Sequence, residues 1–283
     1  MDDQPFTYRL VASDLDGTLL GPRKEISAAN AAAVRRLRDT GARFVLASGR
    51  RHQNSVRFHR QLGLDGLLIS CAGASVRDPQ TGETVHEACL SPTLADELVA
   101  EGEAAGYTVV YYHRDHLYVT TTNHWTDLYE SRVGERAERF PGSLRDLRGE
   151  AALKIVWYGE PSVLQAIRAK VEERYADRLG VVATDPENLE FNAPEANKAR
   201  ALEVVCRFYG VAQEAAVAFG DGENDAPMLR WAGLGVAMDG GNAHAKEAAD
   251  LVSPAGGADD SFARGVEAVF AQVRRPNLRS SSA

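Results

Sequence analysis

The sequence predicts an α/β fold in which a parallel sheet is interrupted by an inserted second domain. Apolar strand-like runs alternate with helix-like segments at both ends of the chain, a pattern typical of a parallel sheet covered on both faces. The middle instead carries two adjacent β-rich runs joined by a short turn, which is typical of an antiparallel hairpin. The length of 283 residues, 44% of them hydrophobic, suffices for one large domain or two smaller ones.

Residues 1–88 are expected to form the first part of the parallel-sheet domain. A strand is expected over 8–13, and the helix after it should begin at the N-cap Ser27 and stop at Gly41. The elements that follow are expected to be a strand, a helix and a strand, over 42–48, 52–62 and 64–70.

Residues 89–190 are expected to form the inserted domain. The chain should cross into it at "CLSP" and leave it at "NAPEAN", because each stretch carries a proline and shifts the composition. Its expected elements are a helix over 91–106, strands over 107–115 and 116–121, a polar helix, a strand over 152–159, a helix over 161–180 and a strand ending near Phe191. We interpret "HRDH" as a polar hairpin turn rather than a metal site, and Lys154 and Trp157 as packing residues.

Residues 191–275 are expected to complete the parallel-sheet domain, and the tail 276–283 is expected to be disordered. The pattern again alternates helix and strand, over 197–210, 215–220, 224–233, 234–238 and 241–250.

Composition excludes several classes of protein. The acidic N-terminus and the short apolar runs predict neither a signal peptide nor a membrane span, which makes the cytoplasm the expected location. A net charge of -8 disfavours general binding to nucleic acid or to anionic membranes. The three cysteines lack any CxxC pair and are expected to be reduced thiols.

Polar side chains follow the expected parallel strands at their carboxyl ends, where ligands bind in such sheets. Asp14 and Asp16 follow the first strand, Ser48 ends the second, Asp221 begins "DGEND" after a later strand, and Lys198 begins a helix. Two carboxylates about 4 Å apart repel each other by roughly 4 kcal/mol at an effective dielectric constant of 20. A hard divalent cation with oxygen ligands relieves this repulsion, and Mg²⁺ suits carboxylates, a carbonyl, water and a phosphate oxygen.

The chain resembles the haloacid dehalogenase superfamily. "DLDGTLL", "LASGR", a lysine at the start of a late helix and "GDGENDAPML" match the four motifs of that family in their usual order. The long insertion and "GVAM" followed by "NAHAKEAADLV" resemble the Cof-type phosphatases. The resemblance covers nearly the whole chain and implies a Rossmann-like parallel-sheet core with an inserted α+β cap domain.

The resemblance also implies a role for each motif residue. Asp14 matches the nucleophile that attacks phosphorus, and Asp16 matches the general acid and base. The protein ligands of Mg²⁺ match the carboxylate of Asp14, the backbone carbonyl of Asp16, and Asp221, with Asn224 and Asp225 in support through water or the phosphate. Lys198 matches the catalytic cation that holds both Asp14 and the phosphoryl group. Phosphate binding is implied for Leu15 through its amide, Ser48, Gly49, Lys198 and Asn224. Taken alone, Asp225 also fits a plain helix N-cap.

The chain departs from the family pattern at a few positions. Ala72 stands where many relatives have an asparagine, which puts a substrate contact in doubt. The turn at Asp239 and Gly240 carries extra residues, and neither departure touches the residues assigned to phosphoryl transfer.

The function expected from these residues is a Mg²⁺-dependent phosphatase that hydrolyses phosphate monoesters of small metabolites, such as sugar phosphates or phosphorylated cofactors, through an aspartyl-phosphate. A phosphomutase would use the same intermediate and return the phosphoryl group to a sugar. A phospho-aspartate signalling module is the alternative from another class, and Asp16 argues against it because an acid/base shortens the lifetime of the phosphorylated state.

Overall fold

A computed structural model describes residues 6–114, 116–147 and 150–273. The chain packs as two compact units, and each is described by itself. The first unit contains the described residues up to Leu46 and from Cys206 onward, and the second is Ala47–Val205. The second unit therefore includes the predicted insertion, 89–190, together with segments on either side of it.

The first unit is built on a five-stranded, all-parallel sheet with the order β14-β13-β12-β1-β2. β1 lies inside this sheet, between β12 and β2, with all four residues buried, which explains its uniformly apolar sequence up to Ser13. The strands are β1 (Leu10–Ser13), β2 (Arg43–Leu46), β12 (Ala216–Gly220), β13 (Leu234–Ala237) and β14 (Leu251–Val252).

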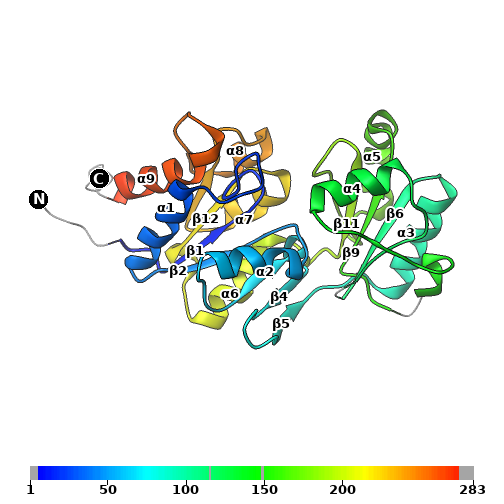
Figure 1. Ribbon diagram of the computed structural model, residues 1–283, viewed down its shortest axis with the longest axis horizontal. Coiled ribbons are helices and arrows are strands. Elements are labelled where there is room, and N and C mark those ends of the chain that lie inside the picture. The colour runs from blue at the N-terminus through cyan, green and yellow to red at the C-terminus, as the bar shows by residue number, and fades with distance from the viewer. Residues whose placement is uncertain (1–5, 115, 148–149, 274–283) are drawn as a thin grey trace, which may run out of the picture. The chain divides into compact units, whose positions relative to one another are not determined.

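Helices cover this sheet. α1 begins after Ser27, whose side chain accepts a hydrogen bond from the Asn30 amide at 3.1 Å, as predicted. α1 and α9 lie side by side in the first unit (Figure 1). The helices of this unit are α1 (Ala28–Asp39), α7 (Ala226–Trp231), α8 (Ala243–Ala248) and α9 (Ser261–Val273), and α6 (Lys198–Tyr209) spans the boundary between the units.

The second unit contains a six-stranded sheet with the order β10-β11-β9-β6-β7-β8, antiparallel except between β7 and β8. β6 and β7 form the predicted hairpin, with His113 paired to His116. The strands are β6 (Thr108–His113), β7 (His116–Val119), β8 (Glu138–Arg139), β9 (Lys154–Tyr158), β10 (Gly180–Val182) and β11 (Asn188–Asn192). The helices are α3 (Pro92–Ala104), α4 (His124–Val133) and α5 (Pro161–Tyr175).

The two faces of this sheet differ in chemistry. Trp157 and Phe191 point to one face, where the Trp157 indole donates to the Leu98 carbonyl of α3 at 3.0 Å, so the predicted packing role of Trp157 is confirmed. The other face carries hydroxyl, amide and charged side chains under α4, whose Tyr129 hydroxyl donates to the Tyr112 hydroxyl at 2.7 Å. This second face, which we call the polar face, consists of alternate residues of three strands: Thr108, Val110, Tyr112, Lys154, Val156, Tyr158, Asn188, Glu190 and Asn192.

The second unit also contains a three-stranded antiparallel sheet with the order β3-β4-β5. The sequence predicted only the first of these strands. Glycine and a proline interrupt the segment, so its strands are short and lack a clear period. They are β3 (Leu68–Ser70), β4 (Ser75–Arg77) and β5 (Thr84–Glu87), and α2 (His52–Gln61) precedes them.

Candidate active site

Asp14 directly follows β1, an interior strand of the parallel sheet in the first unit. Its backbone amide donates to the Phe219 carbonyl of β12 at 2.9 Å, so the parallel pairing of β1 with β12 places it. The residue is only 5% exposed. A carboxylate buried to this extent is costly unless it is paired or coordinated.

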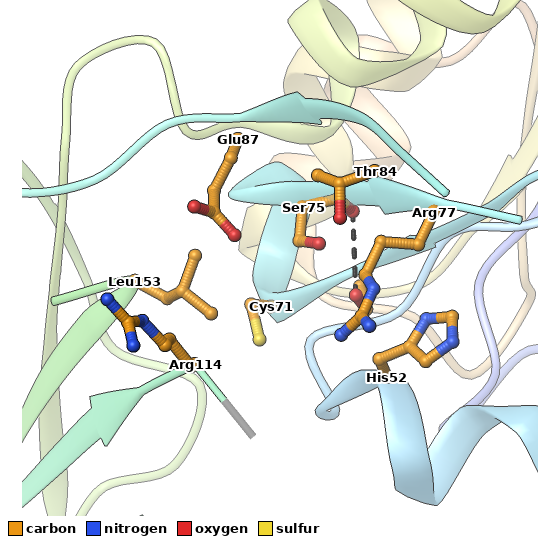
Figure 2. A pocket seen from close by; sticks show the side chains of 9 residues that line it. His52, Cys71, Ser75, Arg77, Thr84, Glu87, Arg114 and Leu153 are labelled. Carbon is orange, nitrogen blue, oxygen red and sulfur yellow. Dashed lines mark hydrogen bonds between the residues drawn. The ribbon is translucent and has the colours of Figure 1, made fainter. Parts of the chain in front are cut away.

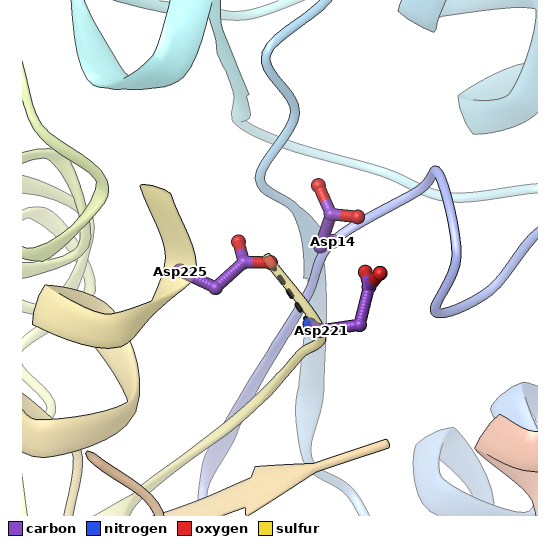
Figure 3. A group of neighbouring side chains, drawn as sticks. All are labelled: Asp14, Asp221 and Asp225. Carbon is purple, nitrogen blue, oxygen red and sulfur yellow. Dashed lines mark hydrogen bonds between the residues drawn. The ribbon is translucent and has the colours of Figure 1, made fainter. Parts of the chain in front are cut away.

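Asp14, Asp221 and Asp225 lie together at the carboxyl ends of β1 and β12 (Figure 3). Each offers a carboxylate oxygen, and these three oxygens lie within 4.8 Å of one another. Asp14 and Asp225 are buried, and Asp221 is partly buried. Three such carboxylates repel one another strongly, and their hard oxygen donors fit a divalent cation such as Mg²⁺.

Hydrogen bonds hold two of these carboxylates in place. Oδ2 of Asp225 accepts from the backbone amides of Asp221 at 3.0 Å and Gly222 at 2.9 Å. The Thr18 hydroxyl donates to Oδ1 of Asp221 at 2.9 Å. Asp225 is the N-cap residue of α7, as its residue type suggested, but its side chain accepts no capping hydrogen bond from that helix. Its carboxylate instead ties the turn 222–225 back to Asp221.

Gly17 fits the turn between Asp14 and Thr18 for two reasons. Its φ of +86° lies in the left-handed region that favours glycine. A Cβ atom at this position would also overlap the carboxylate of Asp221. Only glycine therefore leaves room for Asp221 beside this turn.

Asp16 occupies a more open position than Asp14. Its side chain is 33% exposed, and its Oδ1 lies 2.8 Å from the Lys24 ammonium. Leu15, between the two aspartates, is fully buried. Asn224 is partly buried and immediately precedes Asp225 on the turn after β12. All three residues are thus sequence neighbours of the clustered aspartates. Among them, Asp16 has a carboxylate that is partly exposed to solvent.

Ser48 and Gly49 lie in the second unit. Ser48 is buried, its amide donates to the Ile69 carbonyl at 3.0 Å, and its hydroxyl accepts from the Arg50 amide at 3.1 Å. The Ala72 amide donates to the Ser48 carbonyl at 3.0 Å. These bonds fix the backbone of the loop that contains Ser48 and Gly49.

Lys198 begins α6 and is fully buried. Lysine side chains are almost never fully buried unless they are paired. Gly73, with a φ of +101°, packs so closely on the Asn197 backbone that a Cβ atom would overlap its carbonyl. Gly73 follows Ala72, the position that departs from the family pattern. The segment around Ala72 therefore packs directly against the start of α6.

Cys71 and Ala72 adopt left-handed backbone conformations, with φ of 50° and 56°. Such conformations are uncommon for residues other than glycine and cost free energy. The Cys71 amide donates to the Arg50 carbonyl at 2.8 Å, which helps to hold the strained turn. Nothing in the residue types of this segment signals the strain.

A pocket of about 230 Å³ lies beside this turn in the second unit (Figure 2). It presents basic groups, the Glu87 carboxylate and the Cys71 thiol. The motif residues do not line it. Its lining consists of His52, Ser70, Cys71, Ser75, Arg77, Thr84, Glu87, Arg114 and Leu153.

Sequence interpretation missed the role of Lys154. Its ammonium lies 2.9 Å from Oε2 of Glu190 and 3.4 Å from the carbonyl oxygen of Gly49, and it is buried. Burial acts to lower the pKa of Lys154, but the Glu190 carboxylate more than offsets it and raises the pKa above its usual value. The side chain is thus a buried cation beside the Ser48 and Gly49 loop. The only sequence signal for this buried cation was the occurrence of a lysine within an otherwise apolar strand.

Within the described residues, no helix combines the length and apolar composition needed to cross a membrane.

Comparison with known proteins agrees with the motif resemblance. A family model for haloacid dehalogenase-like hydrolases matches residues 11–264. The chain is 28% identical to the 5-amino-6-(5-phospho-D-ribitylamino)uracil phosphatase YitU of Bacillus subtilis, over 95% of this chain and 99% of that protein. It is 31% identical to the phosphatase YcsE of the same organism, named for the same reaction, over 87% of this chain and 89% of that protein.

A solved haloacid dehalogenase-like hydrolase from Bacteroides thetaiotaomicron has a similar fold, with a TM-score of 0.81 and 26% identity over 93% of this chain and 100% of that chain. The family match covers most of the chain, and the curated relatives named above are phosphatases. The chain therefore belongs to the haloacid dehalogenase-like hydrolases, and within that family it is a phosphomonoester hydrolase of the Cof type.

Proposed function

We propose that the protein is a Mg²⁺-dependent phosphatase that hydrolyses phosphate monoesters of small metabolites through an aspartyl-phosphate on Asp14. The observation that carries this proposal is the cluster of Asp14, Asp221 and Asp225, with carboxylate oxygens within 4.8 Å of one another at the ends of β1 and β12. Buried carboxylates packed so closely suit a cation and an anionic substrate better than a purely structural role.

In the proposed first step, a carboxylate oxygen of Asp14 forms a bond to phosphorus while the bond from phosphorus to the ester oxygen breaks. Asp16 gives its proton to the departing oxygen. In the second step, Asp16 takes a proton from water, the water oxygen bonds to phosphorus, and the bond from phosphorus to Asp14 breaks. The partly exposed position of the Asp16 carboxylate supports this role, because Asp16 must exchange protons with a leaving group and with water.

The cation would be held by Asp14 and Asp221 together with the carbonyl of Asp16, with Asn224 and Asp225 in support. When bound, it would neutralise charge on the transferring phosphoryl group and let the Asp14 carboxylate approach a phosphate dianion. The Thr18 hydroxyl and the amides of Asp221 and Gly222 hold the neighbouring carboxylates in position. Leu15, Ser48, Gly49 and Lys198 are proposed to bind the phosphate oxygens, as their motif positions imply.

The proposed substrates are small phosphorylated metabolites. The relatives YitU and YcsE are named for a phosphorylated ribitylaminouracil, and a relative from Serratia proteamaculans, 29% identical over 83% of this chain and 85% of that protein, is named HMP-PP phosphatase. Sugar phosphates and phosphorylated cofactors are therefore the first compounds to test.

Metal removal tests the proposal directly. Purified protein should release inorganic phosphate from members of a phosphomonoester panel, lose this activity in chelator and regain it with millimolar Mg²⁺. Because the cation binds only the folded cluster, Mg²⁺ at 100 times its Kd should also stabilise the fold by about 2.7 kcal/mol, seen as a rise in Tm. Asp221→Asn should reduce that rise.

Three results would contradict this proposal. Absence of phosphate release from the whole panel would exclude a phosphatase of small monoesters. Transfer of the phosphoryl group to a second sugar without release of phosphate would indicate a phosphomutase. A stable phosphoprotein without turnover would indicate a signalling module.

A further inference from the structure

The polar face of the six-stranded sheet contains three polar residues on one strand that differ in how their side chains are satisfied. Asn188, Glu190 and Asn192 alternate along β11 and therefore point to the same side. All three are buried. Buried polar atoms are normally hydrogen-bonded, so each side chain should have partners.

Two of the three have such partners. Oδ1 of Asn188 accepts from the Thr184 amide at 3.2 Å, and its Nδ2 donates to the Thr184 hydroxyl at 3.0 Å. Glu190 accepts from Lys154 at 2.9 Å and from the Thr184 hydroxyl at 2.8 Å. These contacts form a closed network within the second unit.

Asn192 differs from both. It is only 2% exposed, yet its Oδ1 has no hydrogen-bond partner within the described residues. An unpaired buried acceptor costs about 1–3 kcal/mol, which is a large penalty to retain without a purpose. The missing partner must donate a hydrogen bond, because a carbonyl oxygen only accepts.

The register of the sheet places Asn192 next to Lys154, a residue that contacts the loop of Ser48 and Gly49. Phe191 pairs with Ile155, so the next pair along the antiparallel ladder sets Asn192 opposite Lys154 on the polar face. Tyr112 pairs with Lys154 on its other side, and the Lys154 ammonium lies 4.6 Å from the centre of the Tyr112 ring. That ammonium also reaches the Gly49 carbonyl at 3.4 Å.

We propose that Asn192 is a specificity-determining residue that recognises the leaving group of the substrate, with Oδ1 accepting a hydrogen bond from a hydroxyl group of a sugar or polyol phosphate. This inference rests on the proposed phosphatase function, in which Gly49 binds the phosphate. Lys154 neighbours Asn192 in the register, and its ammonium is held by Glu190 and reaches the Gly49 carbonyl. In this proposal the ammonium donates to another oxygen of the same leaving group. An apolar leaving group would leave Oδ1 unpaired.

The test compares two variants on two classes of substrate. Asn192→Leu removes the acceptor and keeps a similar volume, and Asn188→Leu is its matched control on the same face of the same strand. Ribose 5-phosphate and glucitol 6-phosphate serve as hydroxylated substrates, and phenyl phosphate serves as the ester without a hydroxyl group. Asn192→Leu should lower kcat/KM for the hydroxylated esters by about tenfold or more and change that for phenyl phosphate by less than about twofold.

Stability separates a ligand-binding role from a structural one. Asn192→Leu removes a buried acceptor without a partner, so its Tm should equal or exceed that of the wild type. Asn188→Leu breaks a satisfied network, so its Tm should fall while the preference between the substrate classes stays unchanged. Asn192→Asp retains an acceptor oxygen and should recover part of the preference for hydroxylated esters.

Several outcomes would overturn the inference. These are an equal loss on both substrate classes, a Tm that falls in Asn192→Leu as it does in Asn188→Leu, or a wild-type preference for phenyl phosphate. If the wild type releases phosphate from no monoester at all, the proposed function itself fails and the inference falls with it. Activity on phenyl phosphate with an unchanged preference in Asn192→Leu overturns the inference alone.

Discussion

Asp14→Asn is expected to lower phosphate release by at least about a thousandfold, because an amide cannot form the aspartyl-phosphate. The substitution should not lower the stability of the fold. In chelator, the substitution removes one of three carboxylates that repel one another, so its Tm should equal or exceed that of the wild type. Phosphate release with millimolar Mg²⁺ and a melting curve in chelator are the two measurements.

Asp39→Asn is the control for this substitution. Asp39 is an exposed residue at the end of α1, so the same chemical change there should leave both activity and Tm close to those of the wild type. Near wild-type turnover in Asp14→Asn would refute the nucleophilic role of Asp14.

Gly17→Ala is expected to have the second largest effect. A Cβ atom at Gly17 would overlap the Asp221 carboxylate, so Asp221 must shift away from Asp14 and Asp225. A displacement of about 1 Å in a reacting site costs about a hundredfold in rate. We therefore expect kcat/KM to fall by about a hundredfold and the Mg²⁺-dependent rise in Tm to shrink.

Gly41→Ala provides a close control. Gly41 has a φ of +87°, almost the same as the +86° of Gly17, but a Cβ atom there would meet nothing within 4 Å. Both substitutions should cost about 1–2 kcal/mol of stability from the left-handed backbone. Only Gly17→Ala should impair catalysis, and equal activities in the two variants would exclude the contact with Asp221 as the cause.

The residues of the carboxylate cluster were predictable because their motifs follow buried strands. Parallel strands bring their carboxyl ends to one edge of a sheet, so Asp14 and Asp221 were expected to meet although they are far apart in sequence. The same reasoning predicted the central parallel sheet and the β6 and β7 hairpin.

Other features depend on tertiary contacts that no local pattern records. The Thr18 hydroxyl reaches Asp221, and the left-handed turn at Cys71 and Ala72 is held by the loop of Ser48 and Arg50. Residue type alone indicates neither contact. Lys154 was interpreted as a packing residue, and its pairing with Glu190 appears only once the register of β9 and β11 is known.

The pairing of β1 with β12 also bears on how the protein is made. Leu10 lies beside Ala216, more than two hundred residues later in the chain, and Asp221 follows that partner strand. During synthesis, β1 can pair with β2 early, but its second neighbour, β12, exists only after most of the chain has been made. The intervening segment contains two sheets of its own, and pairing between strands so far apart in sequence is expected to slow folding. A truncated translation product that ends before β12 would carry Asp14, the proposed nucleophile, but would lack Asp221 and Asp225, so we expect unfinished chains to be inactive.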